Sequence, residues 1–151
     1  MELSLVLWGI LAGLVATVAA LPFEGYAYHR WGIRGVFEWH EVHASLFGFQ
    51  SRRAHRLGTL VGHGSAGALA GGAFALGTSW LRLPIPLPVQ GLGLGFLMWV
   101  VTLVVHEGIT AVPPLRNGMG GGPAGASLAG HLAYGAALLA AASLLFRKKI
   151  G

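Results

Sequence analysis

The fold is decided by an uncharged stretch at residues 3–23, which reads LSLVLWGILAGLVATVAALPF. A helix needs about 20 apolar residues to cross a bilayer, and this stretch is long enough. Met1 and Glu2 precede it without a basic residue, and its apolar core is longer than that of a signal peptide. We therefore predict a transmembrane helix of the mature protein rather than a cleaved leader.

The rest of the chain repeats this pattern with three further apolar runs. Pro84, Pro86 and Pro88 interrupt the start of the middle run. Because proline disrupts a helix interior, we predict that this span begins near Val89. The prediction is an all-α integral membrane four-helix bundle, a single transmembrane domain over residues 1–151, with spans at about 3–23, 57–81, 89–107 and 124–146.

The composition excludes several classes of protein. Charged residues make up 10% of the chain, against about 25% in a soluble domain, so they are too few to cover a water-facing surface. The absence of cysteine excludes disulfides, thiolate metal sites and cysteine nucleophiles. The net charge of +5 is not gathered into a basic strip, so no nucleic-acid partner is expected. The expected partner is the lipid bilayer, with its anionic headgroups.

Four crossings would put both termini on one face of the membrane, called side A. The segments 23–56 and 106–123 would then lie on the opposite face, side B. The 10 lysines and arginines divide too evenly between the two sides to indicate which one is cytoplasmic.

Glycines at four-residue spacing predict how the helices pack. Lipid tails are as apolar as leucine, so helices associate in a membrane through close approach of their backbones. The chain has 25 glycines. The predicted contact pairs are Gly9 and Gly13, Gly58 and Gly62, Gly67 and Gly71, and Gly91 and Gly95.

The side-B segment 36–50 has an amphipathic pattern. Trp39 and Phe47 fall on one helical face and Glu38 and Glu41 on the other. The segment is too polar and too short to cross the membrane. We predict an interfacial helix that lies flat on side B between the first two spans.

All seven histidines map to side B or to the side-B half of a span. Ionisable residues within spans are costly and suggest a functional site. Small-residue faces of the four helices would turn these side chains toward one polar pocket. The candidate metal ligands are His63, His106, His131, Glu24 and Glu107, and the candidate cofactor-binding residues are His63, His131 and Tyr134.

Several roles for this pocket remain open. The imidazoles could bind a transition metal ion, or two of them on facing helices could hold a b-type haem. The histidines and glutamates could also relay protons. Alternatively, each histidine only hydrogen-bonds across helices, to Tyr134, Thr102 or a backbone carbonyl, and holds the bundle together. No compact ligand motif in the chain decides among these roles.

Three short motifs resemble those of the YagU-like inner-membrane proteins and their uncharacterised four-span relatives. They are HGSAG at 63–67, GLGLG at 91–95 and GHLAYG at 130–135, within a likeness that covers about residues 57–140. The resemblance implies four spans, a prokaryotic inner membrane and no assigned reaction. It marks His63, His131 and Tyr134 as motif positions.

Together these features predict an integral membrane protein that binds a ligand or positions a partner rather than one that catalyses a reaction. The alternatives are a small accessory subunit of a larger membrane complex, such as a respiratory one, and a homo-oligomeric channel or transporter.

Overall fold

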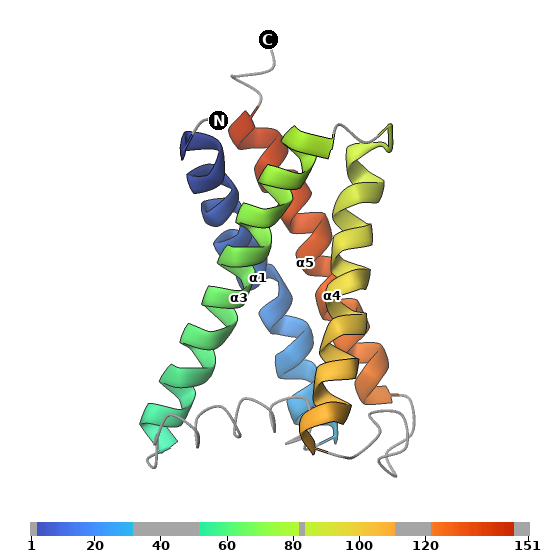
Figure 1. Ribbon diagram of the computed structural model, residues 1–151. Coiled ribbons are helices and arrows are strands. Elements are labelled where there is room, and N and C mark those ends of the chain that lie inside the picture. The colour runs from blue at the N-terminus through green and yellow to red at the C-terminus, as the bar shows by residue number, and fades with distance from the viewer. Residues whose placement is uncertain (1–2, 32–51, 82–83, 111–121, 147–151) are drawn as a thin grey trace.

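The structure is a computed structural model that describes residues 3–31, 52–81, 84–110 and 122–146 (Figure 1). The secondary structure of this part of the chain is all-helical, as predicted, and only residues 84–86 lie outside a helix. The predicted interfacial helix at 36–50 lies outside the described residues. The elements are α1 (Leu3–Trp31), α3 (Arg52–Leu81), α4 (Leu87–Thr110) and α5 (Gly122–Phe146).

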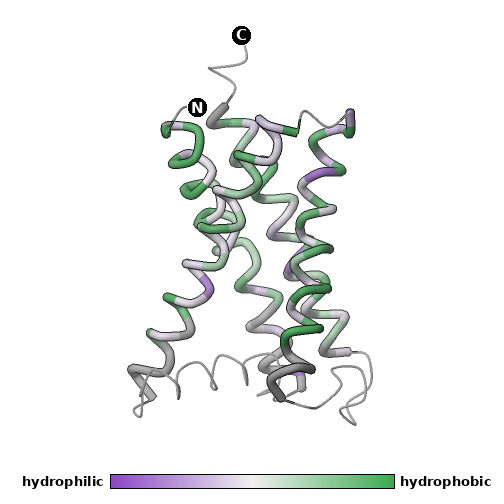
Figure 2. Tube along the Cα trace, in the orientation of Figure 1, coloured by the Kyte–Doolittle hydropathy of each residue, from purple (hydrophilic) through white to green (hydrophobic). Residues whose placement is uncertain are grey.

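Three of these helices are long and apolar enough to cross a membrane, over Leu3–Phe23, Leu87–Val105 and Ala124–Leu144. These ranges agree with three of the predicted spans to within two residues at each end. Helix α3 is longer than any of them, but its glycines and polar residues lower its hydropathy, and much of it is pale in Figure 2 while α4 is strongly apolar. The span at 57–81, and with it the four-span bundle, stays a prediction.

The helices extend beyond the apolar stretches that predicted them. Helix α1 continues past Phe23 to Trp31 and contains Pro22, a residue that membrane helices tolerate. Helix α4 begins at Leu87, so the prediction of a start near Val89 was two residues late. Pro88 fits the first turn of a helix, where a backbone N–H has no partner within the helix to lose.

The close pairings link the helices into a curved row in the order α3, α1, α5 and α4, in which α3 also reaches α5 through one hydrogen bond. Close packing joins α1 to α3, α1 to α5, and α4 to α5. Helix α1 begins and α5 ends at the same end of the bundle, while α3 crosses α1 and diverges toward the opposite end (Figure 1). The two ends of the row, α3 and α4, therefore depend on the central pair for their positions.

Glycines bring α1 and α3 into backbone contact, as predicted for two of the pairs. A Cβ atom on Gly9 would lie 2.6 Å from the carbonyl oxygen of Gly71, and one on Gly13 would overlap the carbonyl oxygen of Gly67. The prediction fails for Gly62, where a Cβ atom would meet nothing within 4 Å. Its side of α3 faces away from α1, so its spacing marks no contact between the described helices.

The pair on α4 makes the second backbone contact. A Cβ atom on Gly91 would lie 2.8 Å from the carbonyl oxygen of Gly135 on α5, and one on Gly95 would overlap the carbonyl oxygen of His131. The predicted packing face of α4 thus lies against α5. This contact also brings α4 close to the backbone of His131, a candidate site residue.

Most buried apolar residues of the core are alanines, and many large apolar side chains point outward. Among the described residues, Leu138 is the largest side chain that is fully buried. Leu3, Leu69 and Leu144 are all more than 70% exposed. Exposed leucines are typical of a surface that contacts lipid. The buried cluster contains Ala12, Ala16, Ala20, Phe74, Tyr134 and Leu138.

Candidate functional site

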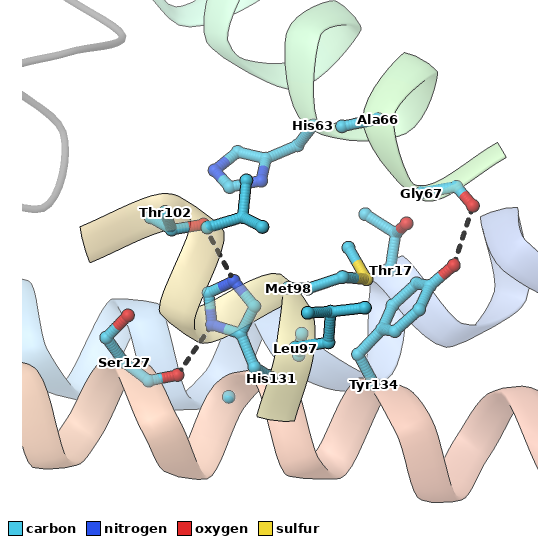
Figure 3. A pocket seen from close by; sticks show the side chains of 13 residues that line it. Thr17, His63, Ala66, Gly67, Leu97, Met98, Thr102, Ser127, His131 and Tyr134 are labelled. Carbon is cyan, nitrogen blue, oxygen red and sulfur yellow. Dashed lines mark hydrogen bonds between the residues drawn. The ribbon is translucent and has the colours of Figure 1, made fainter. Parts of the chain in front are cut away.

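A cavity of about 340 Å³ lies where the four helices face one another. Its walls combine apolar side chains with a few polar ones (Figure 3). The polar residues that line it are Thr17, His63, Thr102, Ser127, His131 and Tyr134.

His131 on α5 is held by hydrogen bonds at both ring nitrogens. Its Nδ1 lies 2.8 Å from the backbone oxygen of Ser127, four residues earlier. A carbonyl oxygen can only accept, so Nδ1 carries the proton. In the neutral ring Nε2 is then an acceptor. The Oγ1 of Thr102 on α4 lies 3.3 Å from Nε2, so the Thr102 hydroxyl donates to it.

The bond from Thr102 to His131 is long. Hydrogen bonds donated by a hydroxyl usually measure about 2.7–2.8 Å between heavy atoms. The bond at Nδ1 therefore fixes the ring, while the bond at Nε2 holds only weakly. A stronger donor in the cavity could replace Thr102 at Nε2.

His63 approaches the same cavity from α3. Figure 3 shows its imidazole and that of His131 on opposite sides of the space, with Thr102 beside His131. The Nε2 atom of His63 is shielded from solvent. Imidazoles from two different helices, α3 and α5, thus line one cavity.

The hydroxyl groups of Tyr134 and Thr17 both donate hydrogen bonds to backbone carbonyls. The Tyr134 hydroxyl donates to the carbonyl oxygen of Gly67 at 2.6 Å and ties α5 to α3. The Thr17 hydroxyl donates to the carbonyl oxygen of Gly13 within α1, at 2.9 Å. Tyr134 lines the cavity, but the proton of its hydroxyl is already engaged. Nε2 of His131, whose bond from Thr102 is long, is an acceptor that the cavity offers to a ligand, and His63 lines the same cavity.

The larger predicted metal site stays a prediction. The backbones of Glu24, His106 and Glu107 lie in α1 and α4, but the structure does not describe their side chains. Within the described ranges, no group of three or more histidine, aspartate or glutamate side chains could hold a metal ion.

The alternative interpretation, that histidines bond across helices, is matched at His131 by the contact with Thr102, which joins α4 to α5. The backbone carbonyl of Ser127 belongs to α5 itself, so that bond does not cross between helices. The same contacts also orient the imidazole toward the cavity, so they do not exclude a ligand. Sequence reasoning missed the lining residues Leu97, Met98 and Val101, because apolar residues in a span carry no signal of a cavity.

No family model, curated protein or solved structure matches the chain. The resemblance to the YagU-like proteins accordingly stays a prediction, and the function has to be argued from the cavity.

Proposed function

We propose that the protein is an integral membrane binding protein, whose cavity holds a small ligand against the imidazoles of His63 and His131. The observation that carries the proposal is that two histidines distant in sequence line one cavity in a highly apolar bundle. Ionisable side chains within membrane spans usually face the interior of the bundle or a cavity and mark functional sites. Two such side chains at one cavity support a binding site over two unrelated interhelical bonds.

The size and lining of the cavity support a small-molecule site. Such sites usually occupy about 300–1,000 Å³ and combine apolar walls with a few polar groups. The volume here, about 340 Å³, is at the lower end of that range. The ligand would be small, or it would extend beyond the cavity.

The orientation of His131 suits a ligand at Nε2. A histidine that binds a metal usually donates its other ring N–H to a carboxylate or a backbone carbonyl, and the bond from Nδ1 to Ser127 has that form. Nε2 would equally accept a hydrogen bond from an organic ligand. Two imidazoles are fewer than the three or four protein ligands of most zinc sites. A metal would need further ligands, such as Glu24, His106 or Glu107.

The test is to purify the protein from its native membrane in mild detergent. Its absorption spectrum, metal content and native mass spectrum then distinguish a haem, a metal ion and an organic molecule. We expect one bound species, lost in His63→Phe and in His131→Phe. Gln90→Leu removes a polar side chain of α4 that does not line the cavity, and it should retain the species. A wild-type protein that carries nothing, or binding that neither histidine affects, would contradict the proposal.

A second candidate, a subunit of a larger membrane assembly, is favoured by α3. Ser65 and Ala73 are exposed on this helix, and Gly62 and Gly77 face open space. Small residues of this kind are typical of contacts between membrane helices. The mass of the native particle tests this candidate, because a monomer without other polypeptides would contradict it.

A further inference from the structure

We infer that the cavity opens sideways to the lipid between α3 and α4, and that it takes an uncharged, lipid-soluble molecule with a hydroxyl group. The inference rests on the proposed binding function and adds the route of entry and the chemical class of the ligand. It is carried by the residues at the mouth of the cavity and by the hydrogen bonds of His131.

The lining residues divide into a floor and a mouth. Those of the mouth line the cavity and are also exposed: Leu97 is 57% and Val101 52% exposed on α4, and Ala66 is exposed on α3. Those of the floor are buried, and all except Gly67 of α3 belong to α1 and α5. They are Thr17, Ala20, Gly67, Ser127, Gly130 and Tyr134.

The packing order explains why the mouth lies there. Helices α3 and α4 are the two ends of the row, and each packs closely on a central helix instead of on the other. The described helices therefore leave the cavity uncovered on the side where α3 faces α4. Figure 3 shows His63 of α3 across this space from Thr102 of α4.

The mouth lies at the depth of the hydrocarbon. Leu97 and Val101 belong to the apolar span Leu87–Val105. At 1.5 Å per residue they lie about 12 and 6 Å along the helix from the end of that span. A molecule that enters at this depth comes from the lipid phase, where an ion is strongly disfavoured. The ligand is therefore uncharged and partitions into the bilayer.

The hydrogen bonds of His131 indicate which polar group the ligand carries. The proton on Nδ1 is engaged with Ser127, so Nε2 offers an acceptor to the cavity. A hydroxyl on the ligand can donate to Nε2 in place of Thr102, whose own bond is long at 3.3 Å. The apolar part of the ligand would then lie against Leu97, Met98 and Val101 and extend into the lipid.

The experiment uses a long-chain alcohol with a diazirine and an alkyne, added to the full-length protein in phosphatidylcholine vesicles. After irradiation, mass spectrometry locates the labelled residues. We expect saturable labelling of Leu97, Met98 or Val101, which the same alcohol without the diazirine competes away. The methyl ether of the probe cannot donate a hydrogen bond. It should label about three- to tenfold less, the equivalent of one neutral hydrogen bond, and His131→Phe should remove this difference.

Two matched pairs of variants test the mouth. Val101→Trp and Ala66→Trp place a large side chain in the mouth and should reduce labelling by about tenfold. Their controls are Val104→Trp and Ala73→Trp, which change an exposed residue of the same type on the same helix outside the cavity. Both controls should label like the wild type.

The outcomes separate this inference from the proposed function. If the native species still depends on His63 and His131 but both mouth variants label like their controls, the side entrance is wrong and the binding function stands. If the ether labels as strongly as the alcohol, the hydroxyl class is wrong. If the purified protein carries no species and no probe labels the cavity, both proposals are wrong.

Discussion

Replacing Gly71 with alanine places one methyl group in the contact between α1 and α3. Its Cβ would lie 2.7 Å from the Gly13 Cα and 2.8 Å from the Gly13 nitrogen, and would overlap the carbonyl oxygen of Gly9. Carbon atoms attract one another best at about 3.5 Å or more. The Gly13 contact alone would therefore require the two backbones to separate by at least about 0.8 Å at this point.

The loss of stability can be worked out relative to a control substitution on the same helix. A gap of this size loses about a quarter to a half of the dispersion energy of the contact. An added methyl group in a close-packed site typically costs about 1–3 kcal/mol. Alanine also gains up to about 1 kcal/mol over glycine in a helix, but Gly62→Ala gains the same without a clash. We expect Gly71→Ala to be less stable than Gly62→Ala by about 2 kcal/mol.

The assay is reversible unfolding in mixed detergent micelles, in which increasing fractions of dodecyl sulfate unfold the protein and circular dichroism follows the helices. Gly77→Ala serves as a second control, because its Cβ would also meet nothing within 4 Å. Gly13→Ala should behave like Gly71→Ala, since its Cβ also enters the α3 backbone. Equal stability of Gly71→Ala and Gly62→Ala would refute the argument that α1 and α3 are in backbone contact.

Three further predictions concern single groups. Tyr134→Phe removes the hydrogen bond from α5 to α3 and should lower the free energy of unfolding by about 0.6 kcal/mol, the average for such bonds in membranes; no change in the same assay would contradict this. Thr102→Val removes the weak competitor at the acceptor imidazole. It should tighten binding of the photoreactive alcohol by about threefold, whereas Thr78→Val, whose hydroxyl bonds within its own helix, should not; weaker binding would place Thr102 in contact with the ligand. If α3 crosses the membrane, cysteines introduced as Glu2→Cys and Gly151→Cys should react with an impermeant thiol reagent from the same side. Reaction from opposite sides would mean that the chain crosses the membrane an odd number of times.

The apolar stretches and the main glycine contacts could be predicted from sequence, because both depend on local properties. A bilayer fixes the length of a span, and a glycine at four-residue spacing marks a place where another backbone can approach. Spacing does not say which glycine face has a partner. Gly9 and Gly13 meet α3, whereas Gly62 lies on a side of α3 that no described helix covers.

The site could be predicted only in part for a related reason. The depth of His63 and His131 within their helices follows from counting residues, and both line the cavity. The opening between α3 and α4 depends on the order of the helices in the row, which no local pattern encodes. Nδ1 of His131 bonds to the backbone carbonyl of Ser127. Every residue has such a carbonyl, so the residue type at position 127 gives no sign of this bond.

The backbone contact between α1 and α3 also determines which substitutions the protein tolerates. A side chain at Gly13 or Gly71 would clash with the facing backbone, so selection should remove most substitutions at these two positions. Outward positions such as Leu69 and Val104 need only an apolar side chain, and leucine, valine and isoleucine should be interchangeable at them. Over evolutionary time, sequence identity among chains with this fold would then decline quickly while the spacing of these glycines persists. A distant relative would be easier to recognise by the register of its glycines than by its percentage identity.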